Sequence, residues 1–156
     1  MKTLLILVGK TTDKHFQAGI SDYVERIGHY MPFEVVNIPE LKNTKSLTEE
    51  QQKTAEGELI LKLLQPSDSV VLLDEHGKEM RSMEFARWLE QKRNTARRLC
   101  FVVGGPYGFS SAVYARANEQ VSLSKMTFSH QMIRLIFTEQ IYRACTIIKG
   151  EPYHHE

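Results

Sequence analysis

Short apolar runs alternate with helical patterns along the whole chain, and this alternation constrains the fold more than any other feature. Candidate strands are residues 3–8, 33–38, 70–73 and 99–103, with a weaker one at 120–123. Strands that alternate with helices predict an α/β fold with a largely parallel sheet and helices on both of its faces. Ligands of such sheets bind outside the carboxyl ends of the strands, so we expect the principal site there.

Five segments between and after these runs have the spacing of helices. One face of the first is marked by apolar residues at helical intervals, namely Phe16, Ile20, Tyr23, Val24 and Ile27. Further helix starts are expected at the capping-box sequence of residues 46–49, at Ser82, and at Ser110 or Ser111. The last helix, residues 131–149, is the longest and is apolar over much of its circumference. We expect it to be buried widely, in the fold or against another subunit.

Length and composition indicate one globular domain, residues 1–156, because a chain of 156 residues builds a single core. With 42% hydrophobic and 25% charged residues, the chain belongs to neither the disordered nor the fibrous class. The opening apolar run is too short for a signal peptide, and no run approaches the roughly 20 residues that span a bilayer. Cys100 and Cys145 lack metal or redox spacing, so we expect a reduced, cytoplasmic protein.

Two glycine-containing turns resemble phosphate-binding motifs but do not match them. The sequence "GKTT" at residues 9–12 needs a glycine where the chain has Leu4, so a surface turn is the better interpretation than a P-loop. The turn in "FVVGGPYGFSS", residues 101–111, does not fit the dinucleotide pattern G-x-G-x-x-G. It is either a tight turn that uses glycine for positive φ or one part of a ligand site.

Two other segments are expected at the same edge of the sheet. The sequence "LLDEHGKE", residues 72–79, ends a strand in an acidic turn, and "SLSKMTFSHQ", residues 122–131, joins the weak last strand to the final helix. Small hydroxyl residues allow close approach of backbone to a ligand and satisfy its polar edges. The three loops together predict a site for an adenosine-like group.

Basic residues and the C-terminal tail each have two interpretations. Lys92, Arg93, Arg97 and Arg98 form either a solvated helix end or a contact surface for an anionic polymer. A formal net charge of only +1 gives no support for a nucleic-acid partner by itself. The tail "GEPYHHE", residues 150–156, is either a frayed terminus or a source of a stacking ring and imidazoles. Its histidine pair lacks accompanying ligands, so no metal site is expected.

Four motifs in order make the chain resemble one family. The sequences "LLDEHGK", "FVVGGPYGFS", "SLSKMTFSHQMIRLIFTEQIYRA" and "EPYHHE" look like those of the RlmH family, ribosomal large subunit pseudouridine methyltransferases of the SPOUT class. The resemblance covers essentially all residues. It implies a parallel α/β sheet whose C-terminal part forms a deep trefoil knot, a rare exception to the rule that chains stay unknotted.

The resemblance also implies the ligand, the partners and the reaction. The methyl donor is S-adenosylmethionine without a metal, the protein is a homodimer, and the substrate is N3 of a pseudouridine in 23S ribosomal RNA on the ribosome. Neither a membrane nor DNA is implied as a partner. The positions that match the family's donor-binding residues are Leu73, Gly105, Ser124, Lys125, Met126, Thr127, Phe128 and Ser129.

The chemistry of the acceptor suggests further residues. N3 of the base is an imide N–H that must lose its proton around the time of attack, so catalysis needs positioning, a proton acceptor and donors to the flanking carbonyls. The candidates are His154 for proton handling or base contact, Tyr153 for stacking, and Glu139 with Arg143 for orienting the site. The Glu139–Arg143 pair is equally consistent with a structural ion pair at i, i+4.

One departure from the family pattern leaves an alternative open. Family tails usually read Tyr-His-Arg, whereas His155 follows His154 here, and a histidine cannot hold a phosphate bidentately as an arginine does. A ribosome- or RNA-binding protein with a retained donor pocket and no turnover is therefore a second hypothesis. The alternation of strands and helices alone also permits a flavodoxin-like nucleotide-binding module.

Overall fold

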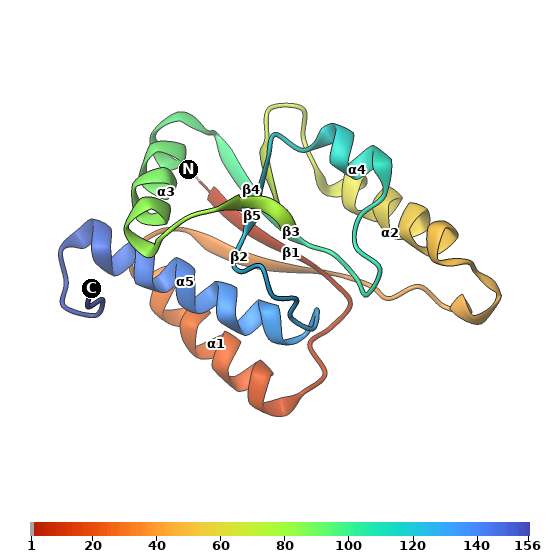
Figure 1. Ribbon diagram of the computed structural model, residues 1–156, viewed down its shortest axis with the longest axis horizontal. Helices are drawn as coiled ribbons and strands as arrows, with labels where there is room; N and C mark the ends of the chain where they lie inside the picture. Colours follow the sequence, from red (N-terminus) through yellow and green to blue (C-terminus); the bar gives the residue numbers. More distant parts are fainter. Residues whose placement is uncertain (1) are drawn as a thin grey trace.

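The sheet has five strands, all parallel, in the computed structural model, which describes residues 2–156. The strand order is β2-β1-β4-β3-β5 (Figure 1). The strands are β1 (Lys2–Val8), β2 (Phe33–Ile38), β3 (Ser69–Glu79), β4 (Arg98–Val103) and β5 (Glu119–Ser122). Each neighbouring pair is parallel, so the carboxyl ends of the strands share one edge. The α/β fold with a parallel sheet that the sequence predicts is confirmed.

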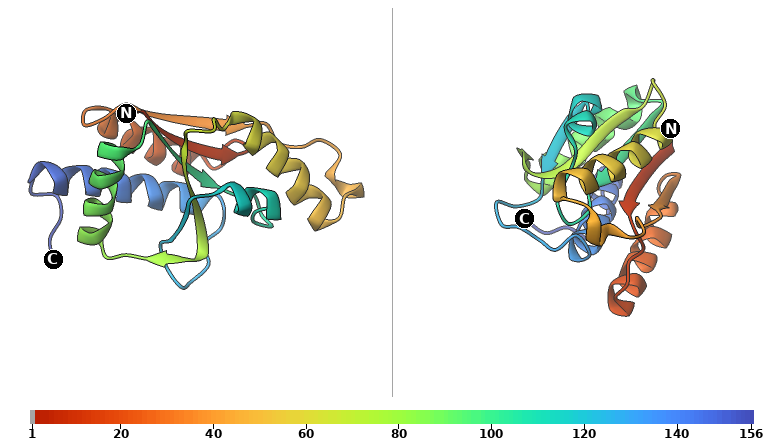
Figure 2. Two further views of the ribbon diagram at one scale, coloured as in Figure 1. Left: turned by 90° about the horizontal axis from the view of Figure 1, so that it is seen from above. Right: turned by 90° about the vertical axis from the view of Figure 1, so that its right-hand side faces the viewer.

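Helices cover both faces of this sheet (Figures 1 and 2). One core cluster joins the sheet to α1 (Lys14–Gly28), α3 (Ser82–Thr95) and α5 (Met132–Lys149). The other joins it to α2 (Glu49–Leu63) and the short α4 (Ser111–Arg116). A 3₁₀ turn, η1 (Thr44–Ser46), precedes α2. Alternate residues of β1 enter the two clusters, Leu5 in the first and Ile6 in the second, as the pleat of a strand requires.

Helix α5 packs against both α1 and α3, so its wide burial is achieved within the fold. Phe137 and Ile141 are completely buried, and the Phe137 ring meets Phe101 edge-to-face with 4.9 Å between centroids. Burying one such side chain contributes about 1.5–3 kcal/mol. None of the helices in residues 2–156 combines the length and apolar character needed to cross a bilayer.

Two predicted helix caps are wrong and one is confirmed. Helix α2 is capped by Thr48, whose hydroxyl accepts from Gln51 N–H at 3.1 Å while Gln51 accepts from Thr48 N–H at 2.9 Å. Ser46 instead lies in η1, because two overlapping capping-box patterns compete and the second one folds. Ser82 is the first residue of α3 and not its cap. Ser110 caps α4 and accepts from Val113 N–H at 3.3 Å.

Strand β3 is longer and less regular than the sequence predicts. Leu73 and Lys78 both pair with Val121 of β5, so the residues between them form a bulge in a continuing strand. The acidic segment that we expected to be a turn after the strand is therefore this bulge. A bulge bends the strand and redirects its side chains. It places Asp74 to His76 beside the loops that follow β4 and β5.

Candidate active site

A cavity of about 510 Å³ opens at the carboxyl edge of the sheet beside β4, β3 and β5. Small-molecule sites typically measure about 300–1,000 Å³. Its walls come from the β3 bulge, the glycine turn after β4 and the segment between β5 and α5, the three loops that the sequence places at one edge. These loops converge because parallel strands deliver them to the same side of the sheet.

The cavity includes all but one of the residues expected to bind the donor. Seven of them line it, namely Leu73, Gly105, Ser124, Met126, Thr127, Phe128 and Ser129. Lys125 is exposed and is not among the lining residues. Met126 is 78% exposed, so this part of the cavity wall faces solvent.

The hydroxyl groups of this loop hold the loop itself. Ser122 donates to the Ser124 carbonyl at 2.8 Å, and the Ser124 hydroxyl accepts from Met126 N–H at 3.0 Å. Thr127 donates to the Glu75 carboxylate at 2.7 Å, which joins the loop to the β3 bulge. Sequence reasoning assigned these hydroxyls to a ligand, whereas in the structure they fix the backbone that lines the cavity.

The glycine turn uses positive φ at only one of its glycines. Gly108 has φ +86°, and its N–H donates to the Gly105 carbonyl at 3.2 Å. A residue with a side chain is strained in this region, so Gly108 meets the expectation of a tight turn. Gly104 and Gly105 are not among the positive-φ residues of the described chain. Backbone strain therefore does not explain them.

The charged lining residues of the cavity are acidic or histidine. They are Asp74, Glu75, His76 and His130, and no Lys or Arg of residues 2–156 is among the lining side chains. Tyr114 donates to Asp74, and burial followed by that carboxylate raises the pKa of Tyr114. Burial and the neighbouring Arg134 lower the pKa of His130. Such a cavity suits a cationic or neutral nucleoside and disfavours a phosphate.

Arg134 supports the cavity from inside the fold and was missed by sequence reasoning. Its side chain is completely buried in α5, and burial lowers its pKa. It donates to the carbonyls of Val8 at 2.7 Å, Gly9 at 3.0 Å and His130 at 3.0 Å. These bonds fasten the end of β1 to the start of α5, next to the loop that lines the cavity. The "GKTT" segment is thus a structural turn, which agrees with the rejection of a P-loop.

The four residues proposed for catalysis form one cluster at the other end of α5. Arg143 forms an ion pair with Glu139 and contacts His154 Nδ1 at 3.1 Å. Tyr153 donates to Glu139 at 3.2 Å. The Arg143 guanidinium lies over the Tyr153 ring, with its Cζ 4.9 Å from the ring centroid. The Glu139 carboxylate raises the pKa of Arg143. The tail is therefore packed back onto α5.

This tail cluster, comprising Glu139, Arg143, Tyr153 and His154, is separated from the cavity within one chain. None of its members is a lining residue in the described chain. Ile133 lines the cavity, and Glu139 and Arg143 follow it six and ten positions later on α5, about 9 and 15 Å along the axis. Figures 1 and 2 show the C-terminus beyond the end of α5 that is remote from the cavity loops.

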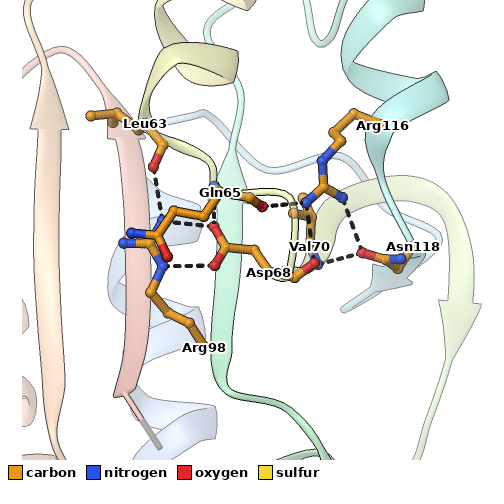
Figure 3. Close-up of polar contacts among 7 residues, drawn as sticks. All are labelled: Leu63, Gln65, Asp68, Val70, Arg98, Arg116 and Asn118. Atoms are coloured by element: carbon orange, nitrogen blue, oxygen red, sulfur yellow. Dashed lines mark hydrogen bonds and ion pairs between the residues drawn. The ribbon is translucent and has the colours of Figure 1, made fainter.

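Two members of the basic cluster at and after the end of α3 are engaged in ion pairs. Arg98 donates to both oxygens of Asp68, at 2.8 and 2.6 Å, at the amino edge of the sheet (Figure 3). Burial alone would raise the pKa of Asp68, but these bonds outweigh it and hold the pKa below its usual range. Lys92 pairs with Glu119. The cluster therefore has a structural role in part, and Arg97 remains an exposed cation.

Metal binding finds no support in the geometry of the described residues. No group of three or more His, Cys, Asp or Glu side chains within residues 2–156 is arranged to hold an ion. Asp74, Glu75 and His76 contact one another and their neighbours at the rim of the cavity.

The chain is similar to known proteins over nearly its whole length. Residues 1–154 match a protein family described as predicted SPOUT methyltransferase. A protein of Bacteroides fragilis (strain ATCC 25285) named Ribosomal RNA large subunit methyltransferase H is 67% identical over 157 aligned positions, which cover the whole of both chains. Proteins of the same name from Bacteroides thetaiotaomicron and Christiangramia forsetii are 64% and 57% identical, with 100% and 99% of each chain covered.

Proposed function

The chain belongs to the SPOUT methyltransferase family, and from this we propose that it transfers a methyl group from S-adenosylmethionine to N3 of a pseudouridine in 23S ribosomal RNA. The observation that carries the proposal is the convergence of the three motif-bearing loops on one cavity. A chain that is 67% identical over its full length and named as a ribosomal RNA methyltransferase supports the RNA substrate. The family also implies the trefoil knot, and a ribosomal substrate supports a cytoplasmic location.

The cavity has the properties that the methyl donor requires. S-adenosylmethionine supplies a methyl group already activated on a positively charged sulfur, so no covalent enzyme nucleophile is needed. Leu73, Gly105, Ser124 and residues 126–129 would hold it, and Lys125, which does not line the cavity, links Ser124 to Met126 within the loop. The carboxylates of Asp74 and Glu75 favour a cationic ligand, and the absence of Lys and Arg among the described lining residues suits a nucleoside without phosphate.

The tail cluster is suited to contact the acceptor base. Because arginine only donates hydrogen bonds, His154 accepts from Arg143 at Nδ1, and its proton then resides on Nε2 when the ring is neutral. An Nε2–H group can donate to a carbonyl that flanks N3 and stabilise the negative charge that develops there. The geometry therefore favours base contact by His154 over acceptance of the N3 proton. Tyr153 offers a ring for stacking, oriented by Glu139 and Arg143.

Separation of the cavity from the tail cluster supports a homodimer with shared sites. Methyl transfer needs reacting atoms about 3–3.5 Å apart, which one chain cannot provide with its tail at the far end of α5. A second copy related by a two-fold axis would bring the tail cluster of one protomer to the cavity of its partner. We infer that the acceptor base is held between the two subunits.

A methyl-transfer assay on ribosomes tests the proposal. The purified protein is incubated with labelled S-adenosylmethionine and ribosomes that carry the unmodified pseudouridine, and the 23S RNA is digested and analysed by mass spectrometry. We expect one added methyl group at N3 of a single pseudouridine. Ribosomes that already carry the methyl group serve as the matched control and should accept none.

The alternative without turnover gives a different result in the same assay. Saturable binding of both S-adenosylmethionine and ribosomes, with no methyl transfer at any pH, would mean that the protein binds donor and RNA without catalysing transfer.

Mixing a donor-site variant with a tail variant tests the shared site separately. Recovery of activity in the mixture supports contribution across the dimer, because only a hybrid dimer contains one intact site.

A further inference from the structure

A buried carboxyl group lies directly behind the glycine turn, on the side away from the cavity. Glu56 of α2 is only 5% exposed. Its Oε2 accepts from Gln52 at 3.2 Å, whereas its Oε1 has no hydrogen-bond partner among the described residues. Burial raises the pKa of Glu56, the Gln52 bond lowers it, and the nearby Glu40 carboxylate raises it again. A buried polar atom without a partner costs free energy, so its presence calls for a physical reason.

Gly105 lies on the other side of this carboxyl group. A Cβ atom added to Gly105 would lie 2.7 Å from Glu56 Oε1, 3.0 Å from Oε2 and 3.1 Å from Cδ. All three distances are shorter than an ordinary van der Waals contact. Since Gly105 is not among the positive-φ glycines, its backbone would accept a side chain if this space were free. The carboxyl of Glu56 therefore accounts for the glycine.

The next residue of α2 makes a second close contact with the same turn. A Cβ atom on Gly57 would collide with the Ser110 hydroxyl and lie 3.2 Å from Val113 Cγ2. Ser110 ends the turn and caps α4. Glu56 and Gly57 thus contact the two ends of the turn, with a large side chain opposite Gly105 and none opposite Ser110. Such complementary surfaces fix the relative position of two segments.

We propose that Glu56 is a positioning residue for the methyl-donor site, because its carboxyl fills the space behind Gly105 and sets the position of residues 104–108 along the cavity wall. The inference rests on the proposed function, since it names a determinant of the same donor site. It also changes the role of Gly105. At this expected donor-binding position, the space that a side chain would fill is occupied by the carboxyl of Glu56.

Donor affinity in paired variants tests this inference. We expect Gly105→Ala to weaken S-adenosylmethionine binding about tenfold in calorimetric titration, since overpacking displaces the turn. Adding Glu56→Ala to Gly105→Ala should restore affinity to within about threefold of wild type, because the space is vacated. Adding Glu56→Gln should restore nothing, because the amide has the size of the carboxyl.

Thermal unfolding of the same variants provides a readout that does not depend on the donor. Gly105→Ala should lower the unfolding midpoint, and Glu56→Ala, but not Glu56→Gln, should recover it in that background. Gly28→Ala is the control for glycine replacement, because a Cβ there has nothing within 4 Å. If the Gly105→Ala/Glu56→Ala protein does not fold, Glu56→Asp takes the place of Glu56→Ala, since it withdraws the carboxyl by one methylene group.

The possible outcomes separate this inference from the proposed function. A wild-type protein that does not bind S-adenosylmethionine contradicts the function, and the Glu56 contact is then judged from the unfolding midpoints alone. Unchanged affinity and stability in Gly105→Ala would overturn the inference. Two further results would overturn it. One is that Glu56→Ala and Glu56→Gln behave equally in the Gly105→Ala background. The other is that neither Glu56→Ala nor Glu56→Asp restores donor affinity and the unfolding midpoint in that background.

Discussion

Arg134 and Arg143 belong to the same helix, α5, and lie nine positions apart, but their surroundings are opposite. Arg134 is completely buried and donates to main-chain carbonyls and the Thr11 hydroxyl, with no carboxylate within ion-pair distance in the described chain. Arg143 is partly exposed and contacts the side chains of Glu139, Tyr153 and His154. Burial lowers the pKa of the first, and a carboxylate raises that of the second.

This difference distinguishes a structural end of the helix from the end that we propose to contact the acceptor base. The bonds of Arg134 go to backbone atoms that cannot change partners without unfolding, so it fixes the end of β1 beside the cavity. The bonds of Arg143 go to side chains that can be exchanged for contacts to a substrate. We therefore expect changes at the donor end to appear in stability and donor binding, and changes at the tail end to appear in methyl transfer.

The largest effect is expected for Arg134→Met. Methionine fills similar space but leaves the buried carbonyls of Val8 and Gly9 without donors, and each loss costs about 1–3 kcal/mol. The free energy of unfolding, measured by urea denaturation, should fall by about 3 kcal/mol or more. Arg143→Met is the matched control and should cost less than about 1 kcal/mol, because partly exposed ion pairs contribute little. Equal losses in the two variants would remove the distinction between the ends of α5.

The second prediction concerns truncation after Pro152, which removes Tyr153 and His154. We expect methyl transfer to fall about a hundredfold, the lower range for losing a group that assists proton transfer or charge stabilisation. Donor affinity should stay within about twofold, since neither residue lines the cavity. Truncation after His154 is the control, because it removes only the exposed His155 and Glu156. If the protein truncated after Pro152 keeps its activity, the tail has no function in methyl transfer.

A smaller effect is expected for Arg143→Lys. The two terminal nitrogens of Arg143 contact Glu139 and His154 separately, and a single ammonium group cannot reproduce this fork. We expect about tenfold slower transfer with unchanged donor affinity and stability, as typical for lost orientation of a reacting group. Arg26→Lys is the control, because Arg26 also lies over a tyrosine ring, that of Tyr142. We expect this variant to transfer methyl groups at the normal rate. Weakened donor binding in Arg143→Lys would place the tail cluster at the donor site.

The sequence predicts the donor end well because its signals are local. Strand runs, glycine turns and hydroxyl-rich loops are short segments, and the parallel topology alone brings the three loops to one edge of the sheet. The bulge in β3 was missed, since the pairing of Leu73 and Lys78 with Val121 depends on the neighbouring strand. The cap at Ser46 failed because Thr48 accepts from the first turn of α2 instead, and the cap at Ser82 failed because α3 begins one residue earlier, after Arg81, with no side-chain hydrogen bond at its cap.

Sequence patterns do not reveal the buried polar residues of the site and its support. Arg134 interrupts an apolar helix face and Glu56 lies in a largely polar helix, so neither position differs from a solvated one until the partners are known. The members of the tail cluster were predicted separately, Glu139 and Arg143 by their i, i+4 spacing and Tyr153 and His154 by their chemistry, but the contacts between the two pairs were not. Its closure depends on Gly150, at φ +74°, which reverses the chain so that the tail returns to α5.

The smallest effect is expected for Lys125→Ala, the one expected donor residue whose side chain does not line the cavity. Because Lys125 is exposed, we expect S-adenosylmethionine affinity within about twofold of wild type by calorimetry. Ser124→Ala is the matched comparison, since its hydroxyl accepts from Met126 N–H and its loss should weaken affinity about fivefold. A larger loss in Lys125→Ala than in Ser124→Ala would mean that the lysine turns inward to the donor. Normal donor binding with slower transfer would instead assign Lys125 to the RNA, on the side of the site that the tail cluster serves.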